Sequence, residues 1–117
     1  MSKRKDRDCL KDIQEAVRRI SLYTKSLTYK SFLTDIKTQD AVIRNLEIIG
    51  EATKNLSIGL RKKYPQSPWT GMAGVRDRLI HHYFGVNLDI VWHIATSEIP
   101  VLESQIEEIL QSEYGGD

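Results

Sequence analysis

The stretch TQDAVIRNLEIIGEATKNL, residues 38–56, decides the fold of this chain of 117 residues. Its apolar residues recur at intervals of three and four, which places them on one arc of an α-helix, and its charged residues line the other arc. We predict a long helix with a wide apolar face, running from Asp35 or Thr38 to Leu56. The apolar arc holds Ala41, Val42, Leu46, Ile48, Ile49, Ala52, Thr53 and Leu56.

Two features of this stretch point beyond the helix itself. Gly50 lies inside it at a cost of about 1 kcal/mol relative to alanine, which indicates a second backbone close by, as in a tight crossing of helices or subunits. Arg44, Glu47 and Glu51 are spaced i, i+3 and i+7 and therefore stack on one face. They form either a solvated, salt-bridged surface or the wall of a polar cleft.

The segments on either side of this helix are also helical in pattern. An amphipathic helix is predicted from Asp6 to about Thr24, and Ser26 to Thr34 has the pattern of one or two helical turns. After the long helix, Ser57 is expected to cap a short turn over Ile58–Lys63.

Two prolines then make a rigid connector, Tyr64–Pro68, because each biases the preceding residue away from helix. Ser67 and Pro68 supply an N-cap and a first helical residue, so the next helix is predicted to begin at Pro68 or Trp69. It is expected to end near Phe84, with Gly85 as the residue after the cap.

The last helix is expected to be capped by Asn87. Its apolar residues alternate spacings of four and three, which is typical of a helix packed along a neighbour at a small crossing angle. Pro100 should kink this rod or divide it. Beyond Gln111 the tail, Ser112–Asp117, is predicted to be frayed.

These segments predict an all-α protein, an up-and-down helical bundle of four to five helices in a single domain over residues 1–117. Homodimerisation through an apolar or small-residue face is expected. Hydrophobic residues at 40% and charged residues at 28% fit one ordinary globular domain with its own core.

The charge of the chain is nearly balanced, with a formal net charge of +1. This value does not indicate a nucleic-acid binder by itself, because long-range attraction to a polyanion needs a clear cationic excess. Three basic runs remain, at Lys3–Lys5, Arg18–Arg19 and Arg61–Lys63. Each is either a local binding patch or a solvated helix face.

Cys9 is the single cysteine, so neither an intramolecular disulfide nor a cysteine-based metal site can form. We interpret it as a small buried hydrophobe rather than a nucleophile. The N-terminus lacks an apolar leader segment, and no window approaches the length of a membrane span. The expectation is a cytoplasmic protein with nothing to cleave off and no membrane association.

The chemically richest stretch is GVRDRLIHHYFG, residues 74–85. On an ideal helix Arg76 and Tyr83 lie within about 20° of each other, whereas His81 is about 140° away. Arg76, His81 and Tyr83 therefore meet only if the helix ends near His82, or if a second copy of the stretch faces them across a symmetric dimer.

The residues of this stretch leave two interpretations open. One histidine of the pair His81–His82 can pack against the bundle while the other faces solvent, and Arg76 and Arg78 can pair with Asp77, Glu47 or Glu51. An arginine fork beside a histidine also suits phosphate recognition and metal-free phosphoryl transfer. No third ligand of suitable spacing is visible, so no metal site is predicted.

The pattern Arg76-Asp77-x3-His81-x-Tyr83 resembles the Arg-x4-His-x-Tyr signature of the HepT-like toxins, a branch of the HEPN superfamily of helical ribonucleases. Residues 38–52, the Tyr64-Pro65 and Pro68-Trp69 connector, and residues 83–87 with 90–92 are similar to that family too. The resemblance covers nearly the whole chain.

The resemblance implies a homodimer in which two copies of the motif face one cleft, and a metal-independent endoribonuclease that needs no cofactor. His81 would be the general base or acid when a ribose 2′-hydroxyl attacks the adjacent phosphate, and Arg76 would hold that phosphate and stabilise its developing charge. Asp77 stands where the family has a small polar residue, often asparagine, and would orient the arginine or the histidine.

The resemblance also implies a partner. Such toxins pair with a minimal nucleotidyltransferase (MNT) antitoxin that transfers AMP to the motif tyrosine, which is Tyr83 here, while His82 fills the variable position. The added charge and bulk would compete with RNA for Arg76. The alternative function is a non-catalytic helical subunit that binds and regulates a partner nucleotidyltransferase, which the near-neutral charge favours.

Overall fold

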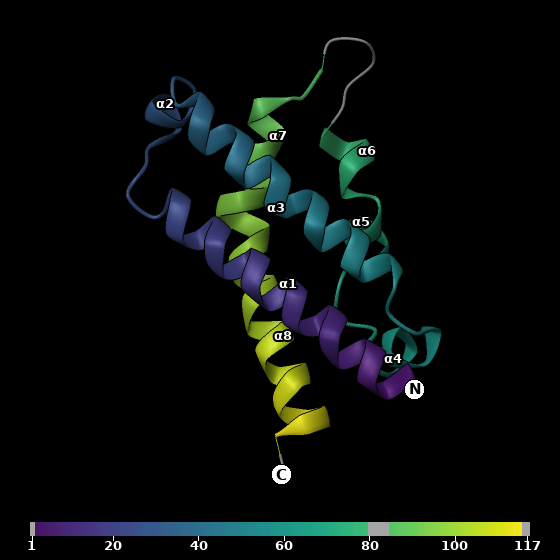
Figure 1. Cartoon of the computed structure of the whole chain (residues 1–117). Helices are drawn as coiled ribbons and strands as arrows, with labels where there is room; N and C mark the ends of the chain where they lie inside the picture. Colours follow the sequence, from purple (N-terminus) through teal and green to yellow (C-terminus); the bar gives the residue numbers. More distant parts are fainter. Residues whose placement is uncertain (1, 80–84, 116–117) are drawn as a thin grey trace.

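The computed structural model describes residues 2–79 and 85–115, and over these residues the chain is helical throughout its regular elements. Three long pieces form the frame (Figure 1): α1 (Ser2–Thr24), α3 (Ile36–Lys54) and a rod made of α7 (Leu88–His93), the π-helical segment η1 (Ile94–Glu98) and α8 (Ile99–Tyr114). The all-α prediction is confirmed. No helix in the described ranges is long and apolar enough to cross a membrane.

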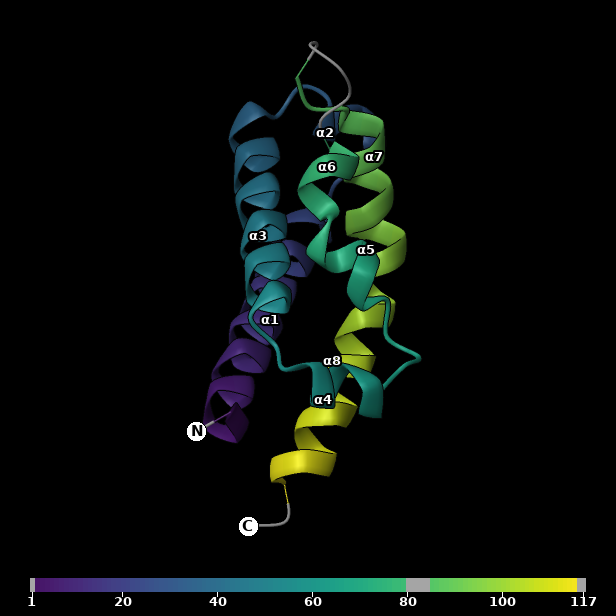
Figure 2. The same ribbon diagram turned by 90° about the vertical axis from the view of Figure 1, so that its right-hand side faces the viewer.

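The long pieces pack around one apolar core. Helices α1 and α3 run antiparallel side by side, and the α7–α8 rod crosses them (Figures 1 and 2). Each contributes the apolar face that its periodicity predicts. The largest fully buried side chains are Leu10, Ile13, Val17, Ile20, Phe32, Val42, Leu46, Ile49, Leu79, Ile99, Ile106 and Ile109.

Helix α1 begins at Ser2, earlier than the predicted start at Asp6. The extra turn contains lysine and arginine, which are good helix formers, and no proline or glycine that would stop it. Cys9 is buried with 8% of its surface exposed, as predicted. Burial raises the pKa of its thiol, which opposes formation of the nucleophilic thiolate.

The short helices close the ends of the frame. Helix α2 (Tyr29–Phe32) confirms the predicted helical turns and begins with a capping box between Thr28 and Ser31. Its Phe32 ring packs on Trp92 of α7, with ring centroids 5.1 Å apart. Helix α4 (Ile58–Lys63) begins as predicted, because the Ser57 hydroxyl accepts a hydrogen bond from the backbone N–H of Leu60.

The segment after the prolines differs from the prediction of one helix from Pro68 or Trp69 to Phe84. It forms two short helices, α5 (Trp69–Ala73) and α6 (Val75–Leu79), which meet at Gly74. Glycine is a poor helix former, and both pieces pack against α3, so tertiary contact sets the break. The predicted end near Phe84 lies outside the described residues, while Gly85 has a φ of 80°.

Two further predictions about this chain's helix ends are wrong. Ser67 is not the N-cap of α5, because Pro68 holds that position without a side-chain hydrogen bond. The tail is helical to Tyr114 rather than frayed beyond Gln111. The hydroxyl of Tyr64 donates to Glu113, and Lys63 pairs with the same carboxylate at 2.7 Å, so the α4 region holds the end of α8.

The predictions for the start and the division of the last helix are confirmed. The backbone N–H of Ile90 donates to the side chain of Asn87 at 3.2 Å, which is an N-cap. Just before Pro100 the rod becomes π-helical over Ile94–Glu98. Proline has no N–H to continue the ladder, so the rod changes register there.

Candidate functional site

Gly50 brings the arginine-rich helix α6 onto the polar side of α3. A Cβ built on Gly50 would lie 3.1 Å from Cγ1 of Val75 and 3.2 Å from the carbonyl oxygen of Met72. Both distances are tighter than ordinary packing, so the missing side chain of Gly50 lets α5 and α6 lie this close to α3 without a shift of either. The close crossing expected at Gly50 is therefore present, and it is between helices of one chain.

This crossing forms a pocket of about 250 Å³ between α3 and α6. Figure 2 shows α6 beside α3, with the α7–α8 rod on its other side. The charged residues that line the pocket come from both helices, and among them are the three residues predicted as a possible cleft wall. The charged lining residues are Arg44, Glu47, Glu51 and Lys54 from α3 and Arg76 from α6.

The side chain of Arg76 is exposed and has no hydrogen bond or ion pair within the described part of the chain. A guanidinium has five donors in a planar fork that matches a phosphate, and no residue described in the structure occupies those of Arg76. With Arg44 and Lys54 it gives the pocket three cations against the two carboxylates of Glu47 and Glu51. The pocket can attract an anion and also orient it.

Arg78 has a different environment from Arg76, although both lie on α6. Its guanidinium donates two hydrogen bonds to Glu98 of η1, at 2.9 and 2.7 Å. This pairing raises the pKa of Arg78 and lowers the pKa of Glu98. Arg78 thus joins α6 to the rod, whereas Arg76 faces the pocket.

The remaining predicted residues are placed only in part. Asp77 is exposed on α6 and does not line the pocket. His81, His82 and Tyr83 lie outside the described residues, so their roles stay predictions. A hydrogen bond links the residues on either side of this segment. The backbone N–H of Asn87 donates to the carbonyl oxygen of Leu79 at 2.8 Å.

Lys54 was not among the predicted site residues, although the sequence contained a signal for it. It continues the spacing of Arg44, Glu47 and Glu51 by a further three residues, so the same face of the helix carries all four. Over residues 2–79 and 85–115, no cluster of three or more His, Cys, Asp or Glu side chains could hold a metal ion.

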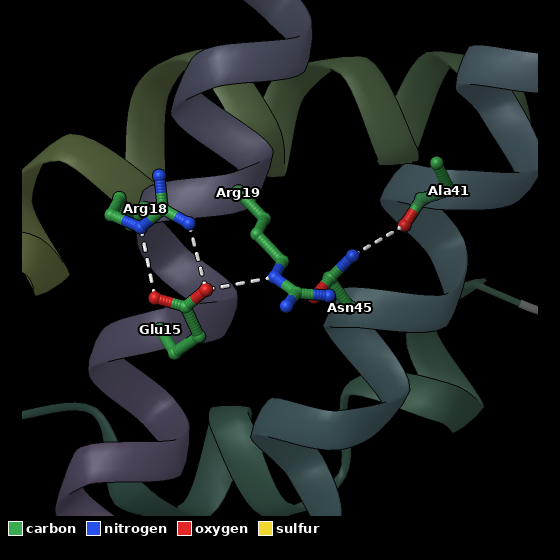
Figure 3. Close-up of polar contacts among 5 residues, drawn as sticks. All are labelled: Glu15, Arg18, Arg19, Ala41 and Asn45. Carbon is green, nitrogen blue, oxygen red and sulfur yellow. Dashed lines mark hydrogen bonds and ion pairs between the residues drawn. The ribbon is translucent and has the colours of Figure 1, made fainter.

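The basic pair Arg18–Arg19 is not part of this pocket. Figure 3 shows both guanidinium groups on Glu15, with Arg18 donating two bonds at 2.8 Å and Arg19 one at 2.9 Å. The two arginines lower the pKa of Glu15 to about 2. This run is therefore a solvated, salt-bridged helix face.

The helical bundle and the arginine pocket together define a class of protein, a small all-α domain that presents an exposed arginine beside a helix crossing. Comparison with known proteins gives the family: the description "Ribonuclease HepT-like" matches residues 13–109, and the chain belongs to this family. No solved structure matches the chain.

Three relatives are similar to the chain over most of their length. A protein of Methanocaldococcus jannaschii named "Putative RNase MJ0127" is 50% identical over 117 residues, which is 100% of this chain and 97% of the relative. "Probable ribonuclease HepT" of Thermococcus cleftensis is 45% identical over 107 residues, 92% of this chain and 97% of the relative. A third, "Putative RNase TTE0752" of Caldanaerobacter subterraneus, is 49% identical over 89 residues, 76% of this chain and 80% of the relative.

Proposed function

We propose that this chain is a metal-independent endoribonuclease toxin of a HEPN/MNT toxin–antitoxin pair. The observation that carries the proposal is Arg76, an arginine without a protein partner in the described residues, in a pocket on a chain of the HepT-like ribonuclease family. An exposed arginine fork is a suitable ligand for an RNA phosphate. Arg44 and Lys54 add positive charge beside it.

The proposed reaction is an attack of a ribose 2′-hydroxyl on the adjacent phosphate. His81 takes the 2′-hydroxyl proton as the 2′-oxygen forms its bond to phosphorus, or it gives a proton to the departing 5′-oxygen as the old bond breaks. Arg76 holds the phosphate and stabilises the charge that develops on it. No metal ion or cofactor takes part in these steps.

In the proposed assembly two copies form a homodimer whose motifs share one cleft. An ideal helix separates Arg76 from His81 by about 140°, so a partner copy is one way to bring them together. Asp77 would then act from α6 as a support that orients Arg76 or His81, rather than as a wall of the pocket.

Regulation in this proposal comes from an MNT-type nucleotidyltransferase antitoxin, which transfers AMP to the hydroxyl of Tyr83. The AMP phosphate on Tyr83 adds negative charge within the motif, seven residues after Arg76, and would compete with RNA for the Arg76 guanidinium. Mass spectrometry of the chain produced together with its neighbouring transferase tests this step. An inactive complex with unmodified Tyr83 would show that inhibition works in another way.

The ribonuclease activity is tested with purified chain, RNA and EDTA. Arg76→Ala and His81→Ala should each abolish cleavage, whereas His82→Ala, the matched neighbour, should keep it. The proposal would be contradicted if EDTA abolished RNA cleavage by the wild type, or if all three variants lost cleavage equally.

A second candidate function is supported by the two carboxylates in the same pocket. Glu47 and Glu51 line it beside Arg76 and would repel a polyanion at short range. A non-catalytic subunit that binds a nucleotidyltransferase would not have to place RNA phosphates beside these carboxylates. Intact RNA at high protein concentration, together with a stable complex with the transferase, would favour this function.

A further inference from the structure

A groove of about 550 Å³ lies between α4 and the start of α5, apart from the Arg76 pocket. Its charged lining side chains are both cationic, Arg61 and Lys62, and no described carboxylate lines it. These residues belong to the basic run Arg61–Lys63, which the Arg76 pocket does not use. The groove therefore attracts anions without the opposing carboxylates found beside Arg76.

The two cations of the groove differ from four basic side chains elsewhere in the chain that are held in ion pairs. Arg18 and Arg19 bind Glu15 (Figure 3), Lys63 binds Glu113, and Arg78 binds Glu98. Within the described residues Arg61 and Lys62 have no ion pair. Their charge is consequently available to a ligand.

The groove also contains two buried polar atoms that lack a partner among the residues the structure describes. Ser67 is 4% exposed and lines the groove, and its hydroxyl has no hydrogen bond. The Nε of Arg61 is likewise buried and unpaired. Buried polar groups nearly always have partners, so these two donors can bind an acceptor from outside the chain, such as water or a ligand oxygen. A phosphate oxygen accepts from both hydroxyl and guanidinium donors.

Apolar surface lies next to these donors. Ile58 lines the groove with 65% of its surface exposed, and Pro65 and Pro68 form part of the wall. Sites for single-stranded nucleic acid combine cations that follow the backbone with aromatic side chains on which the bases stack. The groove has the cations, and Ile58 with the two prolines offers apolar contact in place of an exposed aromatic ring.

Helix α5 connects this groove to the Arg76 pocket. Thr70 and Gly71 line the groove, and Ala73 of the same helix lines the pocket. Residues two apart on a helix are separated by about 3 Å along its axis. The two sites therefore share α5 on its two sides, and a strand that contacts both has to pass across this helix.

We propose that the groove of Arg61, Lys62 and Ser67 binds a backbone phosphate of single-stranded RNA that flanks the nucleotide held at Arg76. This inference rests on the proposed ribonuclease function for the identity of the ligand. The groove adds affinity for a longer strand and sets its path across α5.

The test measures binding of a fluorescent single-stranded RNA by anisotropy at several salt concentrations. The RNA carries 2′-O-methyl groups, so that it cannot be cleaved by attack of its own hydroxyl. Arg61→Ala/Lys62→Ala should weaken binding on the order of tenfold and lower the salt slope by up to about two. Ser67→Ala should weaken it less and leave the net charge unchanged.

The matched control is Lys30→Ala/Lys37→Ala, which removes the same charge from exposed positions outside both sites. It should bind RNA as the wild type does, and circular dichroism should show that all variants are folded. Equal affinity of wild type and the Arg61/Lys62 variant would overturn the proposal, as would a wild type that binds no RNA.

Cleavage of unmodified RNA, measured in parallel, separates this inference from the proposed function. Binding that depends on the groove, in a chain that never cleaves RNA, would support the groove and contradict the ribonuclease. Cleavage of RNA by a chain whose RNA affinity is the same with and without Arg61 and Lys62 would support the ribonuclease and contradict the groove. Unchanged RNA affinity with lost binding of the co-produced transferase would assign the groove to a protein partner instead and overturn the proposal.

Discussion

Asp6 is a carboxylate with only 6% of its surface exposed, close to the start of α1. It accepts hydrogen bonds from the backbone N–H of Ser57 at 2.8 Å and from its hydroxyl at 2.6 Å. The same hydroxyl accepts from the N–H of Leu60 and caps α4. One charged side chain therefore fixes the start of a helix that lies 51 residues away in sequence.

Asp6→Ala should destabilise the fold by about 1–3 kcal/mol, because it leaves the donors of Ser57 without their acceptor in a part-buried site. Urea unfolding followed by circular dichroism measures the change. Asp8→Ala is the control, since Asp8 is exposed on the same helix and should change stability by less than about 0.5 kcal/mol. Similar losses for both variants would show that the contact with Ser57 contributes little.

At the scale of elements, the crossing of α3 with α5 and α6 depends on Gly50. A methyl group there would meet Val75 at 3.1 Å and the backbone of Met72 at 3.2 Å, and backbone cannot turn aside as a side chain can. We expect Gly50→Ala to destabilise the fold by about 1–3 kcal/mol, more than the gain of about 1 kcal/mol in helix propensity. It should also weaken RNA binding, because the pocket lies at this crossing.

The matched control is Gly59→Ala in α4, where an added Cβ meets only the Ser57 hydroxyl, at 4.0 Å. This variant should be neutral or more stable by up to about 1 kcal/mol. Thermal unfolding and RNA anisotropy of the two variants, measured side by side, check the expectation. A Gly50→Ala protein as stable as Gly59→Ala would mean that the crossing adjusts easily.

The link between α6 and the rod is an ion pair with a pH dependence. Hydrogen bonds from Arg78 hold the pKa of Glu98 below its ordinary value of 4.5. A carboxylate with a lowered folded-state pKa contributes stability above its unfolded-state pKa and loses it as the pH falls through the folded-state pKa. The side chains are 39% and 38% exposed, so solvent screening keeps the contribution to about 1 kcal/mol or less.

Glu98→Gln should therefore lower the free energy of unfolding at pH 7 and flatten its decrease below about pH 4.5. Urea unfolding between pH 3 and 7 measures both effects, and high salt should reduce the difference from the wild type. Glu103→Gln, in α8, serves as the charge-matched control. If both variants have the same acid profile, the Arg78–Glu98 pair does not couple α6 to the rod.

At the scale of the whole molecule, the long helices were predictable because burial repeats every three to four residues along them. The break of the helix at Gly74 was not predictable, since it depends on contacts of α5 and α6 with α3. The hydrogen bonds between Asp6 and Ser57 could not be predicted from a sequence pattern, because they join segments that are distant in sequence. For Arg44, Glu47 and Glu51 the sequence allowed a solvated face or a cleft wall, and only the position of α6 places them in a pocket.

The proposed homodimer leads to a test that uses the whole assembly. If Arg76 of one copy acts with His81 of the other, a heterodimer of Arg76→Ala and His81→Ala chains contains one intact site and one site that lacks both groups. Random mixing of the two inactive proteins should then restore about one quarter of the wild-type activity, because half of the dimers are mixed and each has one of two sites intact.

A site built within one chain gives the opposite result, because every copy in the mixture lacks one of its own two groups. The experiment requires subunit exchange, which mixing of differently tagged chains followed by affinity capture can verify. His82→Ala mixed with wild type serves as the control for exchange without loss of a motif group. Recovery of activity would locate the proposed catalysis between two copies, and no recovery in verified heterodimers would confine it to single chains or rule it out.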